Sequence, residues 1–130
     1  YGFLHDRERI CAALTKAGMT WEVLGSDASF ERFARGDVPY GVLHPGSCGH
    51  GLNDLYLSGS ENIVWFGLTY SLEHYQQLNA RLTGGFRALG RKITIHHIVA
   101  DDTKDDDLVP LLSRKDVSQA DLMRAMATFR

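Results

Sequence analysis

The stretch Asn62-Ile63-Val64-Trp65-Phe66 decides the fold class of this sequence. Every residue after the asparagine is apolar. A continuous apolar run of this length is typical of a strand that is buried on both faces, as in a parallel sheet covered by helices. The sequence on either side should therefore supply further parallel strands and the helices that connect them.

Expected strands and helices alternate on both sides of this run. The strands are expected at residues 21–24, 40–44, 62–66 and 92–99, and the helices at residues 5–17, 29–35, 71–82, 103–113 and 118–129. Thr83-Gly84-Gly85 is expected to end the third helix, and Ser118 with Asp121 resembles a capping box at the start of the last. The alternation predicts an α/β fold, a three-layer α/β/α domain with a mostly parallel sheet.

Length and composition fit one ordinary globular domain. The chain has 130 residues, of which 44% are hydrophobic. Its 14 basic and 16 acidic residues give a net charge of −2, whereas a protein that depends mainly on phosphate contacts is usually basic. Contact with nucleic acid would therefore need a local patch, such as Arg87, Arg91 and Lys92 close to Arg81.

The sequence also favours a cytoplasmic protein. No apolar run approaches the length that spans a membrane, and no signal peptide is visible at the start. Cys11 and Cys48 lie far apart without a pairing pattern, as is usual for reduced thiols.

A glycine-rich loop follows the expected strand at residues 40–44. It reads Gly46-Ser47-Cys48-Gly49-His50-Gly51-Leu52-Asn53-Asp54. Ligands in α/β proteins bind at the carboxyl ends of strands, and glycines let backbone amides approach an anion. No Gly-Lys-Ser/Thr follows, so this is not a Walker A loop, and an ordinary turn is the simpler alternative.

The expected helix at residues 71–82 presents two different faces. Its apolar residues share one face; they are Leu72, Tyr75, Leu78 and Leu82. Gln77 and Arg81, four residues apart, project together away from that face. A solvated arginine is the simpler alternative, but with the glycine-rich loop this pair suggests one half of a phosphate site.

Two of these segments resemble motifs of a known family. Gly49-His50-Gly51-Leu52-Asn53 and Gln77-Leu78-Asn79-Ala80-Arg81 resemble motifs V and VI of superfamily 2 helicases, and more narrowly of Swi/Snf-type DNA translocases from phages and bacteria. Residues 62–73 and 95–103 fit the same branch, and residues 3–10 resemble the region after motif IV. The opening Tyr1-Gly2-Phe3-Leu4 resembles the tail of a strand, so we expect a fragment of a longer polypeptide.

The resemblance implies that residues 1–130 are the second, C-terminal RecA-like domain of an ATP-driven helicase or translocase. It implies that Gln77, Arg81 and the loop glycines Gly49 and Gly51 face ATP, with its Mg²⁺, held by an N-terminal RecA-like lobe absent from this chain. It also implies that His50 and Asn53 contact double-stranded DNA. We expect a protein encoded by a bacterium or a phage and located in the bacterial cytoplasm. When bound to DNA it would be at the nucleoid.

The catalytic arginine is the point where the sequence departs from motif VI. That motif has a second arginine three residues after the first, and here Gly84 stands at that position. The arginine finger is therefore Arg81 or, after a longer loop, Arg87, with Arg91 a more distant option. No Walker A lysine occurs in the chain, so this fragment alone should hydrolyse no ATP.

Other classes of function stay open. The chain could be a non-catalytic module that binds nucleic acid or protein and retains the fold. It could also be a metal-dependent nuclease that uses Asp101, Asp102 and Asp105-Asp106-Asp107, although these acids suit a solvated turn before a helix. Two further pairs are weak candidates: Cys48 with His50 as nucleophile and base, and His96 with His97, which should point to opposite faces of a strand and cannot share a metal.

Overall fold

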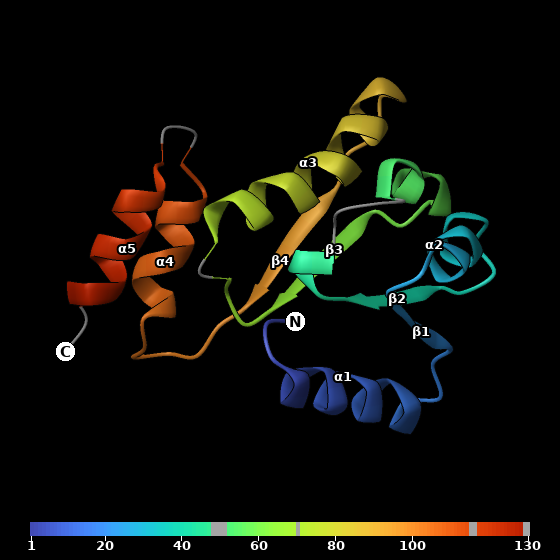
Figure 1. Ribbon diagram of the computed structural model, residues 1–130, viewed down its shortest axis with the longest axis horizontal. Coiled ribbons are helices and arrows are strands. Elements are labelled where there is room, and N and C mark those ends of the chain that lie inside the picture. The colour runs from blue at the N-terminus through green and yellow to red at the C-terminus, as the bar shows by residue number, and fades with distance from the viewer. Residues whose placement is uncertain (48–51, 70, 115–116, 129–130) are drawn as a thin grey trace.

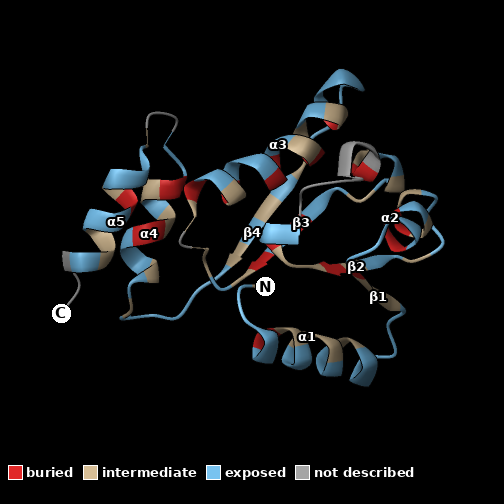
Figure 2. Cartoon of the chain, viewed as in Figure 1, coloured by how far each residue is buried: buried red, intermediate tan, exposed pale blue. Residues whose placement is uncertain are grey.

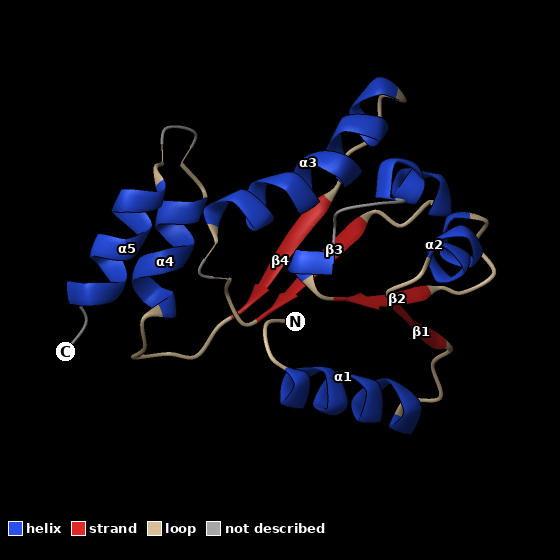
Figure 3. Cartoon of the chain, viewed as in Figure 1, coloured by secondary structure: helices blue, strands red, loops and turns tan. Residues whose placement is uncertain are grey.

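The computed structural model describes residues 1–47, 52–69, 71–114 and 117–128, and these form a mixed α/β fold (Figures 1 and 3). The helices are α1 (Leu4–Lys16), α2 (Asp27–Ala34), α3 (Leu72–Ala88), α4 (Asp105–Leu112) and α5 (Gln119–Thr128). The strands are β1 (Trp21–Leu24), β2 (Tyr40–Leu43), β3 (Asn62–Phe66) and β4 (Thr94–Ile98). Two short 3-10 helices, η1 (Pro45–Ser47) and η2 (Leu52–Ser58), lie between β2 and β3. The expected alternation of strands and helices is confirmed.

The strands pair in parallel, as expected. β1 pairs with β2 from Trp21 opposite Tyr40, and β3 pairs with β4 from Asn62 opposite Thr94. In the described part of the chain these are two separate two-stranded sheets, because no ladder of hydrogen bonds joins β2 to β3. The single sheet expected from the sequence is therefore present as two parallel pairs.

The main core lies beneath α3. The inner face of β3, η2, α2 and the α4–α5 hairpin pack into it, and Figure 2 shows the buried positions on these elements. Its members are Leu24, Phe30, Phe33, Leu55, Ile63, Trp65, Leu72, Tyr75, Leu78, Leu82, Leu108, Leu112 and Leu122. Ile95 of β4 is partly buried against them. Helix α1 contributes no residue to this cluster.

The other face of β3 is not covered as the sequence predicted. Ile63 and Trp65 are buried, but Val64 between them is 56% exposed. Successive side chains of a strand point to opposite faces, so one face of β3 is buried and the other is open. An apolar run marks a strand but does not show which of its faces the neighbouring elements cover.

Helix α3 is longer than predicted, and the prediction that Thr83-Gly84-Gly85 ends it was wrong. The helix continues to Ala88, and the chain turns at Gly90, whose φ of +69° is the left-handed conformation that glycine adopts readily. Gly85 lies against η2: a β-carbon there would stand 2.3 Å from Cγ of Tyr56. Its small size therefore allows a close approach between two elements.

The capping box predicted at the start of α5 is confirmed. The backbone N–H of Asp121 donates to Oγ of Ser118 at 3.2 Å, and the N–H of Ser118 donates to Oδ2 of Asp121 at 3.0 Å. The Ser118 hydroxyl also donates to Oδ2 of Asp121 at 2.6 Å, and this bond together with the one from the Ser118 N–H lowers the pKa of the Asp121 carboxyl. Among the described helices, none is long and apolar enough to cross a membrane.

Candidate functional site

The first turn of α3 is held from two sides. Ser71 precedes the helix, and its Oγ accepts from the N–H of His74 at 3.2 Å. Oε1 of Gln119, at the start of α5, accepts from the N–H of Leu72 at 2.9 Å. These acceptors satisfy donors that a helix start leaves without intrahelical partners. The C-terminal hairpin thus fixes the end of α3 nearest to the predicted site.

Gln77 and Arg81 belong to a row of residues four positions apart that begins at Glu73 and ends at Gly85. Nε2 of Gln77 donates to Oε1 of Glu73 at 2.8 Å. Arg81 is half-buried, one helical turn before Gly85. Because residues four apart share one side of a helix, Arg81 lies on the side of α3 where Gly85 meets Tyr56 of η2.

Both described flanks of the glycine-rich loop pack against α3. Helices η1 and η2 both contact it. A β-carbon at Gly46 would stand 3.6 Å from Cε1 of His74, and the N–H of Gly46 donates to Nδ1 of His44 at 3.0 Å. The predicted ligand residues Gly49, His50 and Gly51 lie outside the described residues. Asn53 is in η2, but its side chain is not described.

The two other candidates for the arginine finger, Arg87 and Arg91, have surroundings different from those of Arg81. Arg87 is exposed and two positions after Gly85, which places it about 200° around the helix from the η2 side. Arg91 donates from Nε to Oε1 of Glu61 at 2.9 Å, and its guanidinium stacks 4.9 Å from the Phe86 ring centre. At Gly84 a β-carbon would have no neighbour within 4 Å, so the position of the missing motif VI arginine is open space.

A cavity of about 580 Å³ adjoins the start of α3. It is lined by Ser71, Leu72, Glu73, Gln76, Gln77 and Gln119. Amide groups predominate, with one carboxylate and no basic side chain. These groups suit a neutral polar ligand better than a phosphate, and Arg81 does not line the cavity.

A buried polar network joins α3 to the sheet beneath it. Nε1 of Trp65 donates to Oδ1 of Asn79 at 3.1 Å, and a hydrogen bond of 2.9 Å joins the Tyr75 hydroxyl to Nε2 of His97. The Trp65 and Tyr75 rings are in contact, with centroids 5.0 Å apart. Burial raises the pKa of the Tyr75 phenol, and burial together with the charge of His96 lowers the pKa of His97. Two contacts on different strands thus fix the rotation of α3 and hence the direction of Arg81.

Sequence reasoning missed this network, although one signal was present. Tyr75 and Asn79 are four residues apart, so a polar group shares the buried side of the helix with the apolar ones. The prediction that His96 and His97 point to opposite faces is confirmed, because Nε2 of His96 bonds Oδ1 of Asn62 at 2.9 Å on the exposed face.

The acidic cluster organises a turn. Oδ2 of Asp105 accepts from the N–H of Ala100 at 3.2 Å, and Oδ2 of Asp106 accepts from the N–H of Asp102 at 2.9 Å. Asp102 adopts a φ of 58°, a conformation that aspartate tolerates in turns. In the described ranges no three His, Cys, Asp or Glu side chains are placed to hold a metal ion. These contacts give Asp105 and Asp106 a structural role at the start of α4.

The chain is similar to a phage protein. It is 33% identical over 129 residues to "Putative protein p41" of Acyrthosiphon pisum secondary endosymbiont phage 1. The match covers 97% of this chain but 27% of that protein, so the chain spans about a quarter of the relative's length. No protein-family model matches the chain, and no solved structure matches it.

Proposed function

We propose that this chain is the C-terminal RecA-like lobe of an ATP-dependent DNA translocase of the Swi/Snf type. Motifs that resemble V and VI support the proposal, as do the alternating helices and parallel strands. The lobe would act in the cytoplasm of a bacterial cell on double-stranded DNA. It would share an ATP and Mg²⁺ site with an N-terminal lobe of the same polypeptide.

The observation that carries the proposal is the position of Arg81. It lies one turn after Gln77 and one turn before Gly85, on the side of α3 that faces η2. The flanks of the glycine-rich loop, η1 and η2, pack against the same helix. A guanidinium and the backbone amides of a glycine-rich loop are both groups that bind phosphate.

Phosphoryl transfer explains why such a lobe would be split from its ATP-binding partner. The reaction depends on positioning and on neutralising charge in the transition state, and an arginine supplied from a second body accelerates it by about 10³ to 10⁵. A lobe that supplies only this arginine has no activity of its own. Closing the two lobes around ATP would couple hydrolysis to a movement on DNA.

The test compares this chain with the longer polypeptide that includes its upstream residues. The isolated chain should hydrolyse no ATP, with or without double-stranded DNA. The longer protein should hydrolyse ATP faster when double-stranded DNA is added. A longer protein whose purified form shows no DNA-stimulated ATP hydrolysis would overturn the proposal.

A non-catalytic binding module is the second candidate, and Gly84 favours it. The residue stands where motif VI has its second arginine, and the space around it would accept a side chain. A module that kept the fold and lost its motor would bind DNA without ATP hydrolysis. DNA binding by a longer protein that lacks ATPase activity is the result that this candidate predicts.

A further inference from the structure

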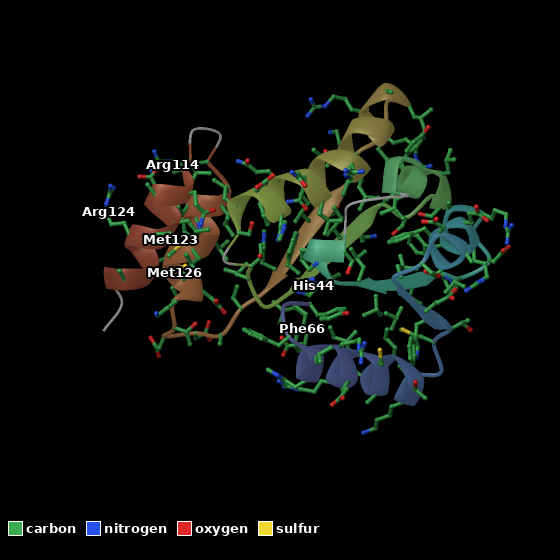
Figure 4. All side chains as sticks on the ribbon, in the orientation of Figure 1. His44, Phe66, Arg114, Met123, Arg124 and Met126 are labelled. Atoms are coloured by element: carbon green, nitrogen blue, oxygen red, sulfur yellow. The ribbon has the colours of Figure 1, made fainter. Side chains whose placement is uncertain are left out.

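The C-terminal hairpin of α4 and α5 meets α3 at the N-terminal end of that helix (Figure 1). Helix α5 contacts both α4 and α3. Its residue Leu122 is buried in the same apolar cluster as Leu72, the first residue of α3. Met126 packs against that cluster, whereas Figure 4 shows Arg124 directed away from α3. One side of α5 therefore attaches the hairpin to the start of the helix that carries the predicted site.

Gln119 adds a polar contact between these two helices. It is the first residue of α5, and its Oε1 accepts from the backbone N–H of Leu72 at 2.9 Å. The capping box of Ser118 and Asp121 encloses Gln119 and orders the backbone from which its side chain projects. The acceptor is thus held at the start of α3 by a well-ordered helix end.

This hydrogen bond and the network beneath α3 act in different directions. The N–H groups of a first helical turn point out of the N-terminal end, roughly along the helix axis. Asn79 and Tyr75 instead bond side chains of the strands beneath, so they hold the helix from the side. The lateral network therefore fixes the rotation of α3, and Gln119 limits its movement along the axis.

The cavity of about 580 Å³ lies beside this bond, and Gln119 and Gln77 both line it. Because there is open space between the two helix starts, side-chain packing does not brace them on that side. A hydrogen bond at such a place carries a larger share of the positioning than one within a tightly packed interface. Residue 119 is therefore the point at which the hairpin acts on the predicted site.

We propose that Gln119 is a positioning residue, which sets where α3 lies along its axis and hence where Gln77 and Arg81 stand relative to a phosphate chain. Its effect passes through the N–H of Leu72 and the backbone of α3. A reacting group misplaced by about 1 Å can lower a rate by up to about 10². The inference rests on the proposed function, because the position of Arg81 affects a rate only if this arginine takes part in ATP hydrolysis.

Two substitutions at residue 119 separate the hydrogen bond from the bulk of the side chain. Gln119→Met keeps an unbranched side chain of similar length and removes the acceptor. Gln119→Glu keeps an oxygen that can accept from the N–H of Leu72. Ala120→Met is the matched control, because it adds the same side chain at the next, exposed residue of α5, outside the cavity.

Amide exchange and NMR of this chain measure the contact directly. In Gln119→Met the N–H of Leu72 should exchange about fivefold faster, the effect of losing one ordinary hydrogen bond. The Nε resonance of Arg81 should shift in the same variant, because the helix is no longer held along its axis. Gln119→Glu and Ala120→Met should keep the parent's exchange rate. Unchanged exchange in Gln119→Met, or an Arg81 resonance that does not move, would overturn the proposal.

Kinetics of the longer protein test the consequence for the reaction. Gln119→Met should lower kcat for DNA-stimulated ATP hydrolysis about fivefold and change KM for ATP by no more than about twofold, because an arginine finger acts mainly in the transition state. Gln119→Glu should restore kcat, which a general loss of packing would not explain.

The two proposals fail in different ways. If the longer protein hydrolyses ATP and Gln119→Met retains the parent's kcat, the role of Gln119 is wrong and the proposed function stands. If the longer protein itself shows no DNA-stimulated hydrolysis, the proposed function is wrong. The exchange of Leu72 and the resonance of Arg81 then decide by themselves whether Gln119 positions α3.

Discussion

Gly85 of α3 lies directly against the ring of Tyr56 in η2, with no room for a β-carbon between them. Gly84, its neighbour, has open space where a β-carbon would be. Two adjacent glycines in one helix therefore do different things. Gly85 permits the contact that holds η2 beside Arg81, and Gly84 contributes only the entropy cost of a glycine inside a helix.

Alanine at these two positions should change stability in opposite directions. Gly85→Ala should lower the free energy of unfolding by about 1–3 kcal/mol, because the methyl group overlaps the Tyr56 ring. Gly84→Ala should raise it by about 0.5–1 kcal/mol, because alanine is the better helix former and meets nothing. Urea unfolding of both variants measures the difference. Stabilisation by both substitutions would show that η2 does not pack on Gly85.

The buried hydrogen bond between Trp65 and Asn79 should matter for stability. Asn79→Leu keeps a side chain of similar size but leaves the indole N–H without its acceptor, at a cost of about 1–3 kcal/mol. Tryptophan fluorescence and urea unfolding together report the loss. Gln77→Ala, on the exposed side of the same helix, is the matched control and should change stability by no more than about 0.5 kcal/mol. Equal effects of the two substitutions would contradict the network.

His97 should make the fold less stable in mild acid. Burial holds its pKa below the usual 6.5, so below that pH the unfolded chain binds a proton that the folded chain does not. Stability from this group is thus complete above pH 6.5 and declines as the pH falls. An NMR titration of the His97 ring, assigned with His97→Gln, measures the pKa directly. A midpoint at or above 6.5 would show that the ring is not buried against Tyr75.

Local patterns predicted much of the fold. The bounds of β1 and β3 were predicted correctly, and the pairing of Gln77 with Arg81 on one side of α3 follows from their spacing alone. The capping box at Ser118 was predictable for the same reason, because both partners lie within one turn. Each of these features depends on residues that are close in sequence.

Features that depend on distant residues were predicted wrongly or missed. Gly85 suggested the end of a helix because glycine is a common helix terminator. The ring of Tyr56, 29 positions earlier, occupies the space that a side chain at residue 85 would need, and no neighbouring residue in the sequence indicates this contact. The apolar run that contains Val64 suggested a strand buried on both faces. The sequence of that run cannot show whether a distant element such as α1 covers the second face. The contact of Trp65 with Asn79 was missed for the same reason.

The last prediction separates Arg81 from Arg87. In the longer protein, Arg81→Ala should reduce DNA-stimulated ATP hydrolysis by about 10³-fold or more, the usual effect of losing an arginine finger. Arg87→Ala should have a much smaller effect, because Arg87 lies on a different side of α3 from η2. Both variants should retain the circular dichroism spectrum and unfolding midpoint of the parent. If Arg87→Ala abolished hydrolysis while Arg81→Ala left it near normal, the nucleotide would have to approach α3 from the side opposite η2, and the site proposed here would be wrong.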